Sequence, residues 1–194
     1  MSDVRLLIFA GSLRSGSFNK KLAAAAAQLA KAAGADVTLI DLKDYPLPVF
    51  DEDIETNEGF PEAAARLKSL FLSHNGLVIA SPEYNSSVTA ALKNAIDWVS
   101  RRQGDEPMKA AFLGKVAALL SASPGALGGM RGLVHLRSIL QNIGIMVLPD
   151  QYSLGQAHKA FDDDGQWQDT SQRDKVDDII QQLVSVIGRL ESGD

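Results

Sequence analysis

Five short apolar segments recur along the chain, and helix-like segments separate most of them. An apolar run that ends at glycine or proline is typical of a strand buried on both faces of a parallel sheet. Segments rich in Ala, Leu and Lys, or with apolar residues spaced near 3.6, are typical of helices that cover such a sheet. We predict strands at 4–10, 36–40, 77–80, 116–120 and 145–148, and helices at 19–33, 61–74, 87–100, 130–142 and 176–190.

This alternation and the length of 194 residues predict one α/β domain over residues 1–194. They favour a doubly wound, flavodoxin-like parallel sheet of five strands in the order 2-1-3-4-5, with helices on both faces. Pro149 is expected to close the fifth strand. The segments 42–60 and 150–170 look long and irregular, which is typical either of binding loops or of simple surface loops.

Charge and composition exclude several classes of partner. The chain has 19 basic and 24 acidic residues, a net charge of −5 and no basic stripe, which argues against nucleic-acid binding. It has no cysteine, so no disulfide or thiolate metal site forms, in keeping with a reducing cytoplasm. The N-terminus lacks a secretory pattern, and the longest uncharged stretch, 116–130, is too short to span a membrane. We therefore expect a cytoplasmic protein without membrane insertion.

The loop after the first strand, Gly-Ser-Leu-Arg-Ser-Gly-Ser-Phe-Asn (11–19), has the composition of a phosphate site. It leads into a helix whose first N–H groups attract anions, and its serines and Arg14 add donors. It is not a nucleotide P-loop, because Ser17 stands where that motif needs lysine. It is not a dinucleotide fingerprint, because Leu13 replaces the second glycine. The remaining alternative is a helix cap at Ser17 without a ligand.

Two further loops follow strands that should end at the same edge of the sheet. The segment 81–87 (SPEYNSS) combines a stiff proline, the flat ring of Tyr84 and the amide of Asn85, which suits a planar heterocycle. Its alternative is a helix-capping turn built on its serines. The segment 121–131 is rich in glycine, which lets a backbone approach a flat ligand, although by itself it is more typical of a flexible loop.

Taken together, these loops resemble the NAD(P)H-dependent FMN reductase family of flavodoxin-like proteins, which includes quinone, chromate and azo-dye reductases. The matching stretches are GSLRSGSFN (11–19), YPLPVFDED (45–53), SPEYNSSVTAALKNAIDW (81–98) and SASPGALGGMRG (121–132). The resemblance covers most of the chain up to about Pro149. Several motifs in the right order on the right strands are far more specific than any one of them.

The resemblance implies one FMN per subunit, held by the three loops. The first loop would bind the phosphate, the second would line the isoalloxazine ring, and the third would contact the ribityl chain or the other edge of the ring. The residues it implies are Ser12, Arg14, Ser15, Ser17, Phe18 and Asn19, then Pro82, Glu83, Tyr84, Asn85 and Ser86, and finally Ser121, Ser123 and Gly125.

The implied activity is that of an FMN-dependent NAD(P)H oxidoreductase. In a ping-pong cycle, NAD(P)H passes hydride to the flavin N5, and a quinone, flavin, azo or chromate-type acceptor then takes two electrons. The flavin carries this chemistry, so no catalytic side chain is expected, and no His/Asp/Glu cluster has metal-binding spacing. The alternatives are a non-enzymatic FMN electron carrier and a flavin redox sensor.

Two points about partners stay open in the sequence. Arg101 and Arg131 are candidates for binding the phosphates of NADPH or NADH, with surface ion pairs as the equal alternative. The resemblance implies a homodimer or homotetramer that joins through the helix at 87–100. The candidate interface residues are Val88, Leu92, Ile96 and Trp98, unless they face the chain's own sheet.

Overall fold

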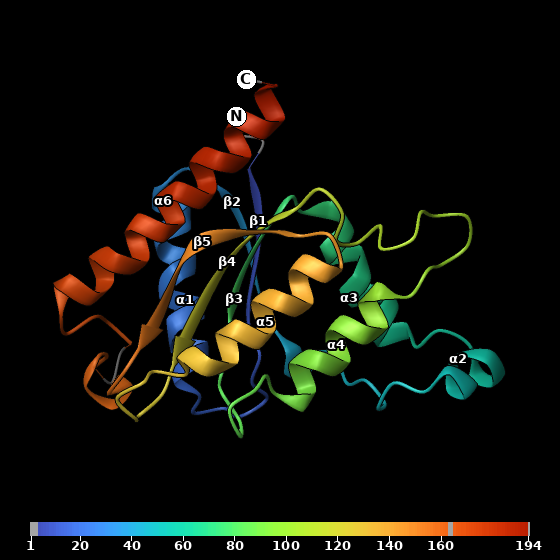
Figure 1. Ribbon diagram of the computed structural model, residues 1–194, viewed down its shortest axis with the longest axis horizontal. Coiled ribbons are helices and arrows are strands. Elements are labelled where there is room, and N and C mark those ends of the chain that lie inside the picture. Colours follow the sequence, from blue (N-terminus) through green and yellow to red (C-terminus); the bar gives the residue numbers. More distant parts are fainter. Residues whose placement is uncertain (1–3, 163–164, 194) are drawn as a thin grey trace.

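The apolar segments of the sequence form one five-stranded, entirely parallel sheet (Figure 1). The computed structural model describes residues 4–162 and 165–193. The strand order is β2-β1-β3-β4-β5, as predicted. The strands are β1 (Arg5–Ala10), β2 (Asp36–Asp41), β3 (Gly76–Ala80), β4 (Val116–Ala122) and β5 (Met146–Leu154).

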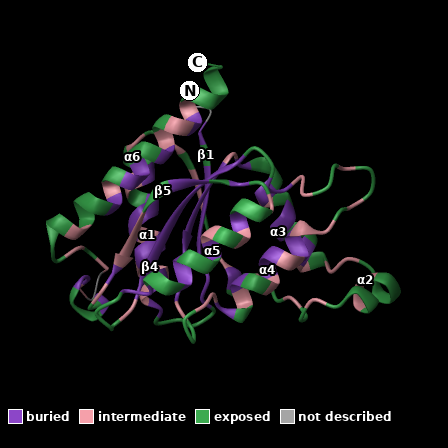
Figure 2. Cartoon of the chain, viewed as in Figure 1, coloured by how far each residue is buried: buried purple, intermediate pink, exposed green. Residues whose placement is uncertain are grey.

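Helices cover both faces of this sheet, which completes the flavodoxin-like architecture. On one face, the apolar sides of α1 (Phe18–Ala32) and α6 (Thr170–Ser192) pack against the strands. On the other face lie α3 (Glu62–Ser73), α4 (Ala90–Ser100) and α5 (Met130–Asn142). The sheet is the most deeply buried layer between them (Figure 2). In the described part of the chain, no helix has the length and apolar character that a membrane crossing requires.

The fifth strand is longer than predicted. It runs from Met146 to Leu154, straight through Pro149, where the sequence suggested that it ends. Proline lacks an N–H group, but an edge strand needs hydrogen bonds on one side only. The pairing with β4 also shifts register between Ala117 and Leu119, which is a bulge-like irregularity at this proline.

Three other boundaries differ from the sequence prediction. The helix predicted from residue 87 begins at Ala90, because Ser87 closes a tight turn. The last helix begins at Thr170 and is capped by Asp169. The prediction began it at residue 176, because its first turns are polar and have no apolar period. The segment 42–60 is not wholly irregular, because it contains a 3-10 turn and the short helix α2 (Glu52–Glu58).

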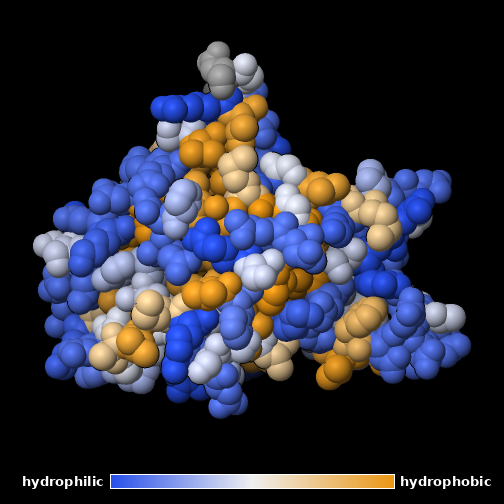
Figure 3. Space-filling model, viewed as in Figure 1, coloured by the Kyte–Doolittle hydropathy of each residue, from blue (hydrophilic) through white to orange (hydrophobic). Residues whose placement is uncertain are grey.

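The proposed interface residues of α4 prove to be core residues. Leu92, Ile96 and Trp98 are almost completely buried within the chain itself. Trp98 donates its indole N–H to the carbonyl of Pro48 at 2.8 Å, and its ring packs against the Phe50 ring in a T-shaped arrangement. The alternative, that this helix faces its own sheet, is therefore the one that the structure shows for Leu92 and Ile96. Trp98 is buried instead against Pro48, Phe50 and Phe60 of the segment before α3. The visible surface over α6 and the protruding α2 is mainly hydrophilic (Figure 3).

Candidate functional site

The carboxyl ends of β1, β3 and β4 meet at one edge of the sheet, and the loops that follow them enclose a hollow of about 360 Å³. This is where ligands bind in open α/β sheets. Eight of the fourteen residues expected to bind the cofactor line it. The lining residues are Arg14, Ser17, Phe18, Asn19, Pro82, Glu83, Tyr84, Ala122, Ser123 and Pro124.

The N-terminus of α1 opens into this hollow without a side-chain cap. Ser17 is the N-cap residue, yet its hydroxyl accepts no capping hydrogen bond from the described part of the helix. The first turn of α1 contains no acidic residue. Arg14 is exposed beside it, and its guanidinium donates to the carbonyl of Gly16 at 3.3 Å. A helix end with free N–H groups and an adjacent guanidinium is well suited to an anion.

The remaining side chains of this loop are used differently. Ser15 is exposed, whereas Ser12 is buried and accepts a hydrogen bond from the N–H of Arg14 at 3.3 Å. The Asn19 amide donates to the carbonyl of Ala122 at 2.8 Å and accepts from its N–H at 2.9 Å. Asn19 therefore fastens α1 to the end of β4, and only its backbone remains available to a ligand.

A tight turn after β3 presents the second set of residues. Tyr84 and Ser87 exchange two backbone hydrogen bonds, of 3.0 and 3.1 Å, around Asn85 and Ser86. Both central residues have positive φ, 51° and 65°, as in a type I′ turn. The turn leaves Tyr84 52% exposed. Its serines do not cap the helix that follows. The cap of α4 is instead Thr89, which was missed because the sequence offers several hydroxyls in a row.

Thr89 closes the N-terminus of α4. Its Oγ1 accepts from the N–H of Leu92 at 3.1 Å and donates to the carbonyl of Gly11 at 2.6 Å. The same hydroxyl therefore caps one helix and anchors the start of the β1–α1 loop. This link joins two of the three loops that surround the hollow.

Glu83 closes the N-terminus of α5. Its carboxylate accepts from the N–H groups of Arg131 at 2.9 Å and Gly132 at 3.1 Å, and from Nε of Arg131 at 2.7 Å. Burial by itself would raise the pKa of Glu83, but the Gly132 N–H and the Arg131 guanidinium outweigh it and hold this pKa below its ordinary value. The Glu83 side chain thus binds the first turn of α5, while the paired Arg131 side chain remains 59% exposed.

The loop after β4 is fixed by the end of β5, which the sequence did not indicate. Ser121 is fully buried and donates to the hydroxyl of Ser153 at 3.0 Å, so its side chain is not presented to the hollow. Ser123 is partly exposed, and its carbonyl accepts from the N–H of Ala157 at 3.0 Å. Gly125 is exposed, and its carbonyl accepts from the N–H of Gln156 at 3.2 Å.

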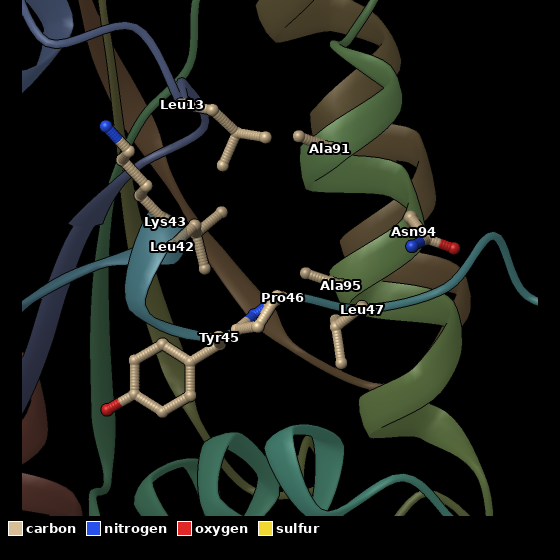
Figure 4. A pocket seen from close by; sticks show the side chains of 9 residues that line it. All are labelled: Leu13, Leu42, Lys43, Tyr45, Pro46, Leu47, Ala91, Asn94 and Ala95. Atoms are coloured by element: carbon tan, nitrogen blue, oxygen red, sulfur yellow. The ribbon is translucent and has the colours of Figure 1, made fainter.

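A second hollow, of about 270 Å³, lies on the other side of the β1–α1 loop (Figure 4). Its walls are mostly apolar and come from this loop, the 42–47 segment and α4. Leu13 and Ala91 face each other at one end, and Tyr45, Pro46 and Leu47 lie at the other.

Arg101 does not lie near the loops. It follows the last residue of α4, whereas the loops surround the first turn of that helix. Its guanidinium pairs with Glu55 at 2.7 Å and with Glu52 at 3.1 Å. The surface ion-pair alternative therefore describes Arg101, and we do not retain it as a ligand of the nicotinamide cofactor. In residues 4–162 and 165–193, no group of three or more His, Cys, Asp or Glu residues is placed to hold a metal.

Comparison with known proteins agrees with this arrangement. Residues 4–159 match the family model described as NADPH-dependent FMN reductase. The chain belongs to this family. It is 36% identical over 189 residues to an NAD(P)H-dependent FMN reductase of Pseudomonas aeruginosa, and the match covers 97% of each chain. It is also 39% identical over 145 residues to a quinone reductase of Escherichia coli, covering 75% of this chain and 73% of that protein.

Among solved structures, this chain superposes on FerB, a flavoenzyme NAD(P)H:(acceptor) oxidoreductase from Paracoccus denitrificans. The TM-score is 0.81 and the identity 28%, with 96% of this chain and 98% of FerB covered. A flavodoxin from the Archaea superposes with a TM-score of 0.59 at 10% identity, with 95% of this chain and 99% of that chain covered, which supports the fold alone.

Proposed function

We propose that this family member is an FMN-dependent NAD(P)H oxidoreductase that passes two electrons to a small acceptor such as a quinone. One observation carries the assignment of the FMN phosphate. Of the three helices that follow the loops around this hollow, α4 is closed by Thr89 and α5 by Glu83, whereas α1 has no side-chain acceptor among the described residues. Its open N–H groups and Arg14 suit a dianionic phosphate.

The residues present fit FMN along the whole hollow. Arg14, Ser15, Ser17 and the backbone N–H groups of Phe18 and Asn19 would hold the phosphate. The rigid Tyr84–Ser87 turn would present Tyr84, Asn85 and Ser86 to the isoalloxazine ring, with Pro82 and the backbone of Glu83 behind them. Ser123 and Gly125 would contact the ribityl chain or the far edge of the ring, whereas Ser121 supports them from the core. When bound, FMN supplies hydride acceptance and electron transfer.

The protein's part in this reaction is binding and orientation. The turn at Asn85 and Ser86 is already in its strained, positive-φ form, so it loses little freedom when a flat ring binds. Tyr84 lines the hollow and is half-exposed, so a nicotinamide and then an acceptor would reach the ring on this side. Arg131, which is exposed and paired with the lining residue Glu83, is the remaining candidate for a phosphate of NADPH or NADH.

The decisive experiment is an anaerobic titration. We expect the purified protein to bind FMN, the bound flavin to bleach rapidly with NADPH or NADH, and a quinone to restore the colour with two electrons per flavin. Slow bleaching that needs a separate reductase would favour the electron carrier. Binding of FMN without bleaching, but with a partner-dependent change on chemical reduction, would favour the redox sensor. No FMN binding would overturn the proposal.

We also propose that the protein is a cytoplasmic homodimer or homotetramer. The apolar hollow beside α4 and Val49, which is 82% exposed, support an interface around the 42–50 segment rather than through the buried side of α4. Light scattering coupled to size-exclusion chromatography would measure the assembly. A monomer at micromolar concentration would contradict it.

A further inference from the structure

A buried carboxylate lies in the wall of the hollow. The Glu83 side chain is only 8% exposed, whereas that of its partner Arg131 is 59% exposed. Glu83 accepts the first N–H groups of α5, so it compensates the partial positive charge of that helix end. Water screens the Arg131 guanidinium more than it screens the carboxylate, so the carboxylate acts more strongly on the interior of the hollow.

The first turn of α5 is shaped to bring Glu83 this close. A Cβ atom on Gly132 would lie 3.3 Å from Cβ of Glu83 and 3.2 Å from the carbonyl of Ser87. A Cβ atom on Gly129 would lie 3.5 Å from the same Glu83 atom. Because both positions are glycine, the carboxylate reaches the helix N–H groups directly. The charge is therefore held at one place in the wall by backbone donors.

We propose that Glu83 and Arg131 are positioning residues that set the reduction potential of bound FMN in opposite directions. Reduced FMN is richer in negative charge than oxidised FMN, so a fixed carboxylate in the wall favours the oxidised form and lowers the potential. The Arg131 charge acts in the opposite sense. Glu83 thus neutralises the positive end of α5, which would otherwise stabilise reduced FMN. The reduced flavin therefore remains a strong electron donor. This inference rests on the proposed function, because it needs FMN in the hollow.

The test compares two variants of the FMN-loaded protein, Glu83→Gln and Arg131→Gln. The two-electron potential is measured against a reference dye, and FMN dissociation constants are measured for both oxidation states. For Glu83→Gln we expect the reduced form to gain about tenfold in relative affinity, which corresponds to about 30 mV more positive. For Arg131→Gln we expect a smaller shift of opposite sign. Glu106→Gln is the matched control, because it removes an ion-paired carboxylate at the other end of the sheet.

The sign of the shifts separates a charge effect from a loosened turn. If the pair only braces the turn, both variants weaken oxidised and reduced FMN alike, and neither potential moves. Shifts of the same sign, or none, in protein that still binds FMN would overturn the inference and leave the proposed function intact. If Glu83→Gln fails to fold or to hold FMN, Arg131→Gln alone tests the inference. The inference then requires that this variant lowers the reduction potential of bound FMN. Failure of the unaltered protein to bind FMN would overturn the proposed function instead.

Discussion

The N-termini of α1 and α5 lie at the same edge of the sheet, yet they are finished in opposite ways. The end of α1 has no acidic residue in its first turn and has Arg14 beside it. The end of α5 is filled by the Glu83 carboxylate, which accepts two backbone N–H groups. Both helices have the same partial positive charge at this end. The comparison teaches that side chains, and not the helices themselves, decide which end can receive a ligand anion.

The strongest way to break this contrast is to give α1 an acid of its own. Ser17→Asp would cap the helix and pair with Arg14, so we expect FMN affinity to fall by about 100-fold or more through repulsion of the phosphate. The apoprotein should be unchanged or slightly more stable, because Asp is a good N-cap. Isothermal titration and thermal unfolding would measure both. Ser17→Asn caps without charge, and equal FMN affinity in the two variants would contradict the phosphate assignment.

Removing the cation beside α1 should have the next largest effect. Arg14→Ala deletes a charge-assisted contact worth about 1.5–3 kcal/mol, so FMN should bind about 10- to 150-fold more weakly. Riboflavin, which lacks the phosphate, should bind the variant as well as it binds the unaltered protein. Fluorescence quenching of both flavins would test this. An equal loss for riboflavin would show that Arg14 acts on the loop and not on the phosphate.

The third helix end, that of α4, sharpens the comparison because its cap also supports the phosphate loop. Thr89→Val removes the acceptor for Leu92 and the donor to Gly11, so we expect a loss of about 1–2 kcal/mol of folding stability. Denaturant unfolding measures this loss. Thr89→Ser keeps the hydroxyl and should recover most of the stability. FMN affinity should fall much less than in the Arg14 variant, and a larger fall would place Thr89 in direct contact with the ligand.

The smallest expected effect is a pH dependence at α5. The pKa of Glu83 lies below its ordinary value of 4.5 in the folded protein, so its carboxylate stabilises the fold above that pH. This stabilisation should be lost as the pH falls through the lowered pKa. The unfolding free energies of the unaltered protein and Glu83→Gln should therefore differ near neutrality and converge in acid. A difference that is independent of pH would show that the charge of Glu83 contributes nothing to stability.

Much of the architecture could be predicted from the order of apolar runs. Strands buried on both faces cannot tolerate polar side chains, so β1, β3 and the start of β4 stand out in the sequence. The edge strand β5 and the polar first turns of α6 were missed in part, because neither needs a continuous apolar period. Pro149 misled the prediction, since it breaks only those strands that are paired on both sides.

The candidate site shows the same division. From the residue types alone, the Ser/Arg loop at the start of α1 already indicated a phosphate site, and Tyr84 and Asn85 already suggested a flat ligand. The sequence could not show that the side chains of Asn19 and Ser121 form hydrogen bonds with Ala122 and Ser153, since those partners are far away in the chain. In the sequence, Arg101 is as good a candidate as Arg131 for binding the phosphates of NADPH or NADH. In the structure it lies at the far end of α4, paired with Glu55.

The sequence by itself therefore determined the layers of the fold, the edge at which the loops gather and the kind of ligand they suit. Local patterns of apolarity, glycine and hydroxyl residues are enough for that, because each acts on its own strand, turn or helix end. Only the tertiary structure decided which helix end is open and which is closed. The acceptor that closes α5 comes from Glu83, on a different strand and loop, and such a contact exists only after the sheet has formed.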